Sequence, residues 1–314
     1  MPRRCLNWNG PWFALVALLF LANGACKRRV DLPLVETDLP LAEADRPKHL
    51  PENIVAAWKG AGAHVQVGWM RMDSGGFLEF FEGEKAAKPG DLPAFRFVYG
   101  WEEGSLAKLP APASAFGLTP STWSGATPVD VLLKDLAGLK SLQALNLSGT
   151  KVTDAGLKAL AGMTSLQTLD LHATEVTDVG LKELTGLTTL QSLNLAGASV
   201  TDAGLKELAG LKSLQVLLLG MDVTDAGLKE LAGLTSLQQL FLFNTKVTDA
   251  GLKHLAGMKD LQKLHLSGSL VTDAGLKELA GLKSLQKLNL HATKVTDAGL
   301  KDLQQALPGC RFIR

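Results

Sequence analysis

Residues 142–160 read LQALNLSGTKVTDAGLKAL, and this stretch decides the fold because the chain repeats it. Its second half, Val-Thr-Asp-Ala-Gly-Leu, starts at Val152, returns with a Val-Gly variant at Val176, and starts again at Val200, Val223, Val247, Val271 and Val295. Successive copies are 24, 24, 23, 24, 24 and 24 residues apart. A unit this short cannot bury a core alone, so we expect each copy to be one coil of a solenoid.

Each copy divides into a strand and a helix. Leu145 and Leu147 alternate with small or polar residues and therefore face the same side of a short strand. Leu157 and Leu160, three residues apart, give a short helix one apolar face. We expect these leucines to meet in one stacked interior.

The pattern L-x-x-L-x-L followed by T-D-x-G-L resembles the leucine-rich repeat family. The nearest subclass is the cysteine-containing type, found in eukaryotic F-box proteins and in many exported bacterial proteins. The resemblance covers a little over half of the chain and implies an α/β horseshoe of about eight coils. The chain departs from the family at the turn after the strand, where the usual Asn or Cys is replaced by Thr150, Thr174, Ala198, Thr245, Ser269 and Thr293. We therefore expect the Asn ladder to be absent or replaced by hydroxyl groups.

Composition excludes some classes of protein. The 314 residues carry a formal net charge of +1, which argues against a nucleic-acid-binding protein with a basic face. All six Trp lie in the first 123 residues, so the N-terminal third is built differently from the repeats. Cys5, Cys26 and Cys310 suggest neither a disulfide framework nor a metal site. Cys310 replaces a core leucine, and we expect it to be buried.

The first 26 residues are typical of an export signal. Arg3 and Arg4 precede an apolar run over 13–22, shorter than the roughly 20 residues that span a membrane. Gly24-Ala25-Cys26 resembles a bacterial lipobox, although Asn23 stands where Leu is usual. We predict a lipoprotein signal peptide over 1–26, lipidation of Cys26, and an exported protein anchored to a membrane of the cell envelope. An ordinary secreted protein and a retained membrane anchor are the alternatives.

The rest of the chain divides by composition and period. Residues 27–50 predict a flexible tether. Residues 51–112 predict a small α+β module, with a helix over 51–58 and a three-stranded meander over 64–70, 77–81 and 94–99. It would serve as a cap or spacer, or as a ligand-binding module. We expect a degenerate capping repeat over 113–136, seven repeats over 137–303 and a C-terminal cap over 304–314.

Three columns recur in the copies, and each has a structural explanation. The Asp of T-D-x-G-L, Asp154 in the first copy, is expected to cap its own helix instead of binding cations. Lys158, four residues later, is expected to pair with that Asp. Gly156 fits the tight packing of helix starts.

The outward-facing strand positions vary between copies and can encode a ligand. Leu218, Met221, Phe241 and Phe243 bring large apolar groups together beside the copy that is one residue short. Exposed clustered aromatics usually mark a partner site, although these could instead stack on each other to fill the irregularity. With His265 they form the candidate ligand-binding site.

No catalytic motif competes with binding. We therefore expect a non-enzymatic scaffold without a cofactor, which binds an unknown protein or peptide on its concave strand face with Phe241 and Phe243 as anchors. The alternatives are a structural spacer and a glycan or cell-wall polymer binder. In the glycan alternative, sugars would contact Asn146, Asp170, Asn194 and Asn289 and stack on Trp101 or Trp123. An F-box-like adaptor is opposed by the export signal, and a shared fold does not transfer function.

Overall fold

The computed structural model describes residues 48–60, 65–83, 87–98, 103–120 and 128–314. The predicted signal peptide with Cys26, nearly all of the tether, Trp101 and Trp123 lie outside these residues. The chain divides into two units, Met1–Pro40 and Leu41–Arg314, and every described residue belongs to the second. Within this described part, no helix is long and apolar enough to cross a membrane.

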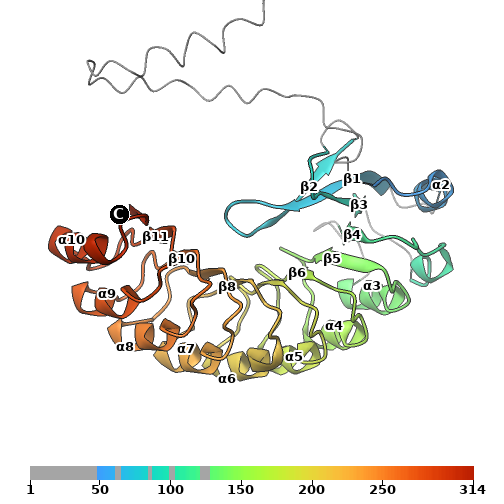
Figure 1. Cartoon of the computed structure of the whole chain (residues 1–314). Helices are drawn as coiled ribbons and strands as arrows, with labels where there is room; N and C mark the ends of the chain where they lie inside the picture. Colours follow the sequence, from blue (N-terminus) through green and yellow to red (C-terminus); the bar gives the residue numbers. More distant parts are fainter. Residues whose placement is uncertain (1–47, 61–64, 84–86, 99–102, 121–127) are drawn as a thin grey trace, which may run out of the picture. The chain divides into compact units, whose positions relative to one another are not determined.

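The 24-residue period produces a parallel sheet with one strand per coil. Leu145, Leu169 and Leu193 are direct neighbours on three consecutive strands. The strands are β5 (Leu142–Asn146), β6 (Thr168–Asp170), β7 (Ser192–Asn194), β8 (Val216–Leu219), β9 (Gln239–Leu242), β10 (Lys263–His265), β11 (Lys287–Asn289) and β12 (Arg311–Ile313). They line the concave side of the repeat array (Figure 1).

Short helices return the chain along the convex side (Figure 1). They are α3 (Val129–Leu136), α4 (Asp154–Leu157), α5 (Asp178–Leu181), α6 (Asp202–Leu205), α7 (Asp225–Leu231), α8 (Asp249–Leu252), α9 (Asp273–Leu279) and α10 (Asp297–Ala306). Four of these continue as 3-10 helices: η4 (Lys158–Leu160), η5 (Lys182–Leu184), η6 (Lys206–Gly210) and η7 (Lys253–Leu255). The predicted alternation of strand and helix is confirmed.

The leucines form one continuous apolar core. Leu145 and Leu147 on the strand side and Leu157 and Leu160 on the helix side are completely buried. The same cluster runs without a break from the N-terminal module to the last coil, where Cys310 is buried as predicted. Burial raises the pKa of the Cys310 thiol to about 11, so this cysteine is a packing residue and a poor nucleophile.

The repeated aspartates do not cap their own helices, which corrects the sequence-based expectation. The cap is the preceding threonine: the Thr177 hydroxyl accepts a hydrogen bond from the N–H of Val179. Asp154 instead reaches the next coil and accepts hydrogen bonds from the Thr177 N–H and hydroxyl, at 2.8 and 2.7 Å. The same two bonds join Asp130–Thr153, Asp178–Thr201, Asp202–Thr224, Asp225–Thr248, Asp249–Thr272 and Asp273–Thr296.

This Asp–Thr ladder explains two other columns. A Cβ at Gly180 would overlap the Oδ1 of Asp154, so the glycine makes room for the carboxylate of the preceding coil. The lysines four residues after the aspartates were expected to pair with them, but no such ion pair occurs within the described residues. The reason is that the carboxylates from Asp154 to Asp273 are turned toward the threonine of the next coil, while Asp297 in the last copy pairs with Arg314.

The turn after each strand explains the missing residue of the short copy. A residue with positive φ stands there in the other coils: Gly149, Ala173, Gly197, Asn244, Gly268 and Ala292. In the short copy, none of Gly220, Met221 and Asp222 has a positive φ. The deletion therefore removes the left-handed residue and shortens the turn, as expected. The β8–β9 register and the Asp202–Thr224 bonds are unchanged.

The N-terminal module extends the same sheet. Its elements are α2 (Glu52–Lys59), β1 (Val65–Met72), β2 (Leu78–Glu82), β3 (Leu92–Phe97) and η3 (Leu106–Lys108), and the capping repeat contributes β4 (Phe116–Thr119). The helix and strands lie where the sequence predicts them, but the predicted meander is wrong. The central strand is β1, which pairs antiparallel with both β2 and β3, and β3 pairs in parallel with β4. This order places Phe95 and Phe97 of β3 in the shared core.

Candidate binding surface on the concave face

The concave face consists of two columns of side chains in register across the strands. The first runs Ala144, Thr168, Ser192, Val216, Gln239, Lys263, Lys287 and Arg311. The second runs Asn146, Asp170, Asn194, Leu218, Phe241, His265, Asn289 and Ile313. The side chains that this face presents come from these columns or from the turns that follow them.

A hairpin of the module lies over part of this face (Figure 1). We call residues 72–78, from the last residue of β1 to the first of β2, the hairpin tip. Asp73 builds its turn, because the Asp73 Oδ1 accepts hydrogen bonds from the N–H groups of Gly75 (2.8 Å) and Phe77 (2.9 Å).

The return side of the tip contacts the coils of β5 and β6. Asn146 donates from Nδ2 to the Leu78 carbonyl at 2.8 Å, and the Leu78 N–H lies 3.5 Å from the Asp170 Oδ2. The Phe77 ring meets the His172 ring edge to face, with centroids 5.7 Å apart. Polar and aromatic contacts therefore fix this side.

The far side of the tip rests on apolar residues of β8 and β9. Gly76 (φ 84°) lies so close that an added Cβ would be 2.9 Å from Leu218 and 3.2 Å from Phe241. Met72 and Phe77 pack against the cluster that contains these two residues. The hairpin thus covers the face from β5 to β9, a contact that the sequence analysis missed. The only sequence signal was a Gly-Gly turn flanked by Met72 and Phe77.

The covered part includes polar side chains that the glycan alternative requires. Asp170 and Asn194 are buried, and Asn146 is bonded to the hairpin. Burial raises the pKa of Asp170, although hydrogen bonds from the N–H groups of His172 and Leu78 act in the opposite direction. Asn146 and Asp170 contact Leu78 of the hairpin, and Asp170 and Asn194 are closed off from solvent.

The structure separates the five residues of the predicted ligand site. Leu218 and Phe241 are buried, with exposed fractions of 0% and 4%, because the hairpin tip covers them. Met221 is 63% exposed but lies in the shortened turn after β8, off the strand columns. Phe243 and His265 remain partly exposed. Of the predicted set, only these last two stand together at the edge of the covered region.

Phe243 and His265 form a compact aromatic group. Their ring centroids are 4.3 Å apart, and Phe243 stacks on the buried Phe241 at 5.6 Å. The Asn289 side chain approaches the His265 Nε2 at 2.6 Å. Burial, with a smaller contribution from the charge of Lys287, lowers the pKa of His265 to about 4. The imidazole is therefore neutral at neutral pH and offers a flat, uncharged surface.

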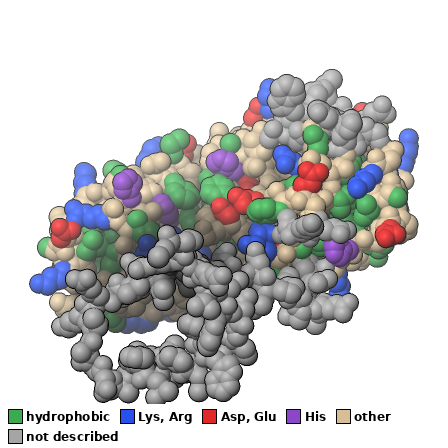
Figure 2. Space-filling view, turned by 90° about the horizontal axis from the view of Figure 1, so that it is seen from above, with side chains coloured by type: hydrophobic (Ala, Val, Ile, Leu, Met, Phe, Trp, Pro, Cys, Tyr) green, Lys and Arg blue, Asp and Glu red, His purple; other side chains and the backbone are tan. Residues whose placement is uncertain are grey.

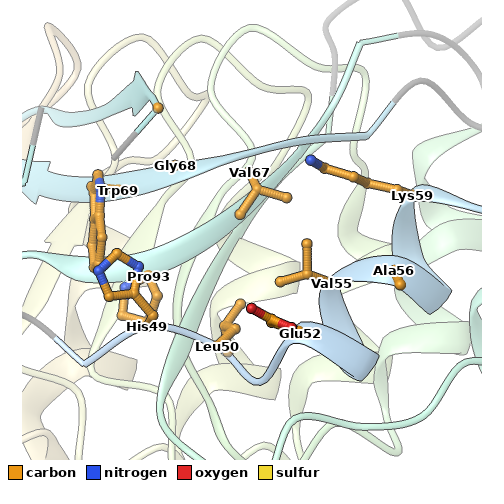
Figure 3. Close-up of a pocket in the computed structure, with 11 residues that line it drawn as sticks. His49, Leu50, Glu52, Val55, Ala56, Lys59, Val67, Gly68, Trp69 and Pro93 are labelled. Atoms are coloured by element: carbon orange, nitrogen blue, oxygen red, sulfur yellow. The ribbon is translucent and has the colours of Figure 1, made fainter. Parts of the chain in front are cut away.

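A second concavity lies in the module, with a volume of about 580 Å³. Figure 3 shows His49 and Trp69 on one side and Val55 of α2 on another. The charged side chains on α2, Glu52 and Lys59, are exposed. Among the described lining residues, none has a buried side-chain nitrogen or oxygen atom without a hydrogen-bond partner. In the described part of the chain, no cluster of His, Cys, Asp and Glu could hold a metal ion.

Comparison with known proteins identifies the repeats. The family model described as Leucine Rich repeat matches residues 138–161 and 186–209. Among solved structures, the chain is similar to internalin C2 of Listeria monocytogenes, with 28% sequence identity over 62% of this chain and 84% of that one and a TM-score of 0.45. No curated protein matches the sequence.

Proposed function

We propose that this α/β leucine-rich repeat solenoid is a non-enzymatic scaffold that binds a protein or peptide on the part of its concave face that the hairpin leaves open. The observation that supports the proposal most directly is the partly exposed pair Phe243 and His265, where the hairpin cover ends. Aromatic side chains held rigidly on a preformed surface lose little entropy on binding and often dominate the affinity.

Photocrosslinking tests this surface in the cell. Benzoylphenylalanine introduced in place of Phe243 is expected to capture a distinct protein. The same group in place of Val179, which is 62% exposed at the start of α5, is the control on the helix side. An excess of wild-type protein should compete with capture, whereas an excess of Phe243→Ser should not, and the circular dichroism of the two competitors should be the same. Equal capture from both positions, or none from position 243, would reject the concave surface.

We further propose that residues 1–26 direct export and that Cys26 carries a lipid, with 27–50 as the tether. The support is the basic start, the apolar run and the Gly24-Ala25-Cys26 motif. Palmitate labelling of the full chain in a bacterial host is expected to mark wild type and not Cys26→Ser. A labelled Cys26→Ser protein, or an unlabelled wild type recovered in the soluble fraction, would contradict lipidation.

A further inference from the structure

The first column of the concave face changes character where the hairpin cover ends. Under and beside the hairpin the column is uncharged: Ala144, Thr168, Ser192, Val216 and Gln239. The next three strands carry Lys263, Lys287 and Arg311, which are direct register neighbours. We call these three residues the cationic row. Because neighbouring strands are about 4.8 Å apart, the backbone positions of these three residues span roughly 10 Å.

The charges of the cationic row are not neutralised within the described residues. None of the three forms an ion pair there, whereas Arg314, close by in sequence, is paired with Asp297. Asp260 precedes β10 by three residues but is not among the groups that shift the pKa of His265. The charge that does act on His265 is that of Lys287. Figure 2, seen from above the array, shows blue and purple side chains, with red ones among them, toward the left, the end that β10 and β11 occupy in Figure 1.

The row is a local feature and not a consequence of a basic protein, because the formal net charge of the whole chain is only +1. The row lies beside His265, on which the charge of Lys287 acts, and the His265 ring contacts that of Phe243. The open surface therefore combines an aromatic pair with a line of cations. A complementary ligand carries several carboxylates and an apolar side chain beside them. Three cations are few for a nucleic acid, since such proteins commonly neutralise about 6–10 phosphates.

We propose that the open end of the concave face binds an acidic segment of a partner protein. Its Asp or Glu carboxylates pair with Lys263, Lys287 and Arg311, and an apolar side chain packs on Phe243 and His265. This inference rests on the proposed scaffold function and specifies the chemistry of the partner.

A selection from a phage-displayed library of random peptides tests the inference with the full chain as bait. Peptides selected on wild type are expected to be enriched in Asp and Glu. Their affinity should fall at least tenfold on Lys263→Glu/Lys287→Glu and at high salt. The matched control is Lys229→Glu/Lys253→Glu, which changes the same charge at exposed positions on the helix side and should leave binding unchanged.

The outcomes separate this inference from the proposed function. Non-acidic peptides that are lost on Phe243→Ser would overturn the acidic partner and keep the scaffold. Peptides that do not depend on Phe243, or no selected peptides, would overturn both. An equal loss of peptide affinity on Lys229→Glu/Lys253→Glu would overturn the acidic-segment site, because the effect would then come from the overall charge of the protein. If an oligothymidylate probe bound more tightly than the selected peptides, and this binding were lost on Lys263→Glu/Lys287→Glu, the ligand of the cationic row would be a nucleic acid and the acidic partner would be overturned.

Discussion

At the scale of single residues, the Asp–Thr ladder ties each coil to the next, because the repeated Asp of one coil bonds the repeated Thr of the following coil. The carboxylate of Asp178 accepts two hydrogen bonds from Thr201 in the next coil, and Gly204 of that coil leaves the space that the carboxylate occupies. The glycine is therefore required by its neighbour and not by its own helix. The sequence of a single repeat does not reveal this requirement, because the aspartate and the glycine that makes room for it lie in successive copies of the motif.

Gly204→Ala tests the constraint. The added Cβ would overlap the Asp178 carboxylate, so we expect a loss of about 1–3 kcal/mol in the free energy of unfolding, measured by denaturant titration. Gly210→Ala is the matched control, since no atom lies within 4 Å of its Cβ position, and it should cost nothing. In the Asp178→Ala background, Gly204→Ala should cause a smaller loss in the free energy of unfolding. Equal costs in both backgrounds would show that the ladder does not require the glycine.

His265 makes a prediction about pH. Its pKa is about 4 in the folded protein and near 6.5 in the unfolded chain, so the unfolded state binds the additional proton between these values. Stability from this residue is complete above pH 6.5 and is lost as the pH falls toward 4. The free energy of unfolding of wild type should therefore decline more between pH 7 and 4.5 than that of His265→Gln. Parallel pH profiles would contradict a buried, neutral imidazole.

At the scale of elements, the strands and helices of the repeats follow from local periodicity, and the sequence predicts them well. The position of the hairpin does not follow in this way. Gly76 lies so close to Leu218 and Phe241 that an added Cβ would contact both, although they are more than 140 residues away in sequence. No sequence pattern in either segment predicts this contact. For this reason Leu218 and Phe241 were expected to be exposed members of a ligand site whose anchors were Phe241 and Phe243. Leu218, Phe241 and Phe243 do belong to one apolar cluster, but Met221 is exposed and lies outside it. The hairpin of the same chain covers Leu218 and Phe241.

The two glycines that flank β2 allow the hairpin contact to be isolated. Gly76 and Gly83 have nearly the same φ, 84° and 85°, but only Gly76 has side chains of the concave face within 4 Å. Gly76→Ala and Gly83→Ala should therefore suffer similar backbone strain, while Gly76→Ala alone should lift the tip. We expect faster amide exchange across β1 and β2 and stronger binding of a hydrophobic dye only for Gly76→Ala. Identical behaviour of the two variants would show that the tip contributes no contact energy.

At the scale of the whole folded unit, one core connects the module to the repeats, but each coil contacts mainly its neighbours. Trp58 fixes the N-terminal end of this core: it is fully buried, stacks on Phe95 at 4.2 Å and donates from Nε1 to the Pro110 carbonyl at 2.9 Å. The sequence marked this end as different through its tryptophans. It could not show that the module and the array share a core, because that depends on β3 pairing with β4.

Trp58→Ala should therefore act locally. We expect a loss of about 3–5 kcal/mol for the module and the first coils, because the cavity cannot collapse against a stacked ring. Amide exchange in β10 and β11 should remain close to wild type, since those strands lie far along a chain of nearest-neighbour contacts. Equal acceleration across all strands would show that the array unfolds as a single cooperative unit.

The docked hairpin also determines where this array can change in length. A coil duplicated between β5 and β9 would move Asn146 and Asp170 away from Leu218 and Phe241 by one strand spacing, about 4.8 Å. A tip of fixed length could not then reach both groups. A coil added after β9 would leave the hairpin contacts intact and enlarge only the open surface. Gene duplication can therefore extend the open end of this array without disturbing the hairpin, while the covered end is held to its present number of coils.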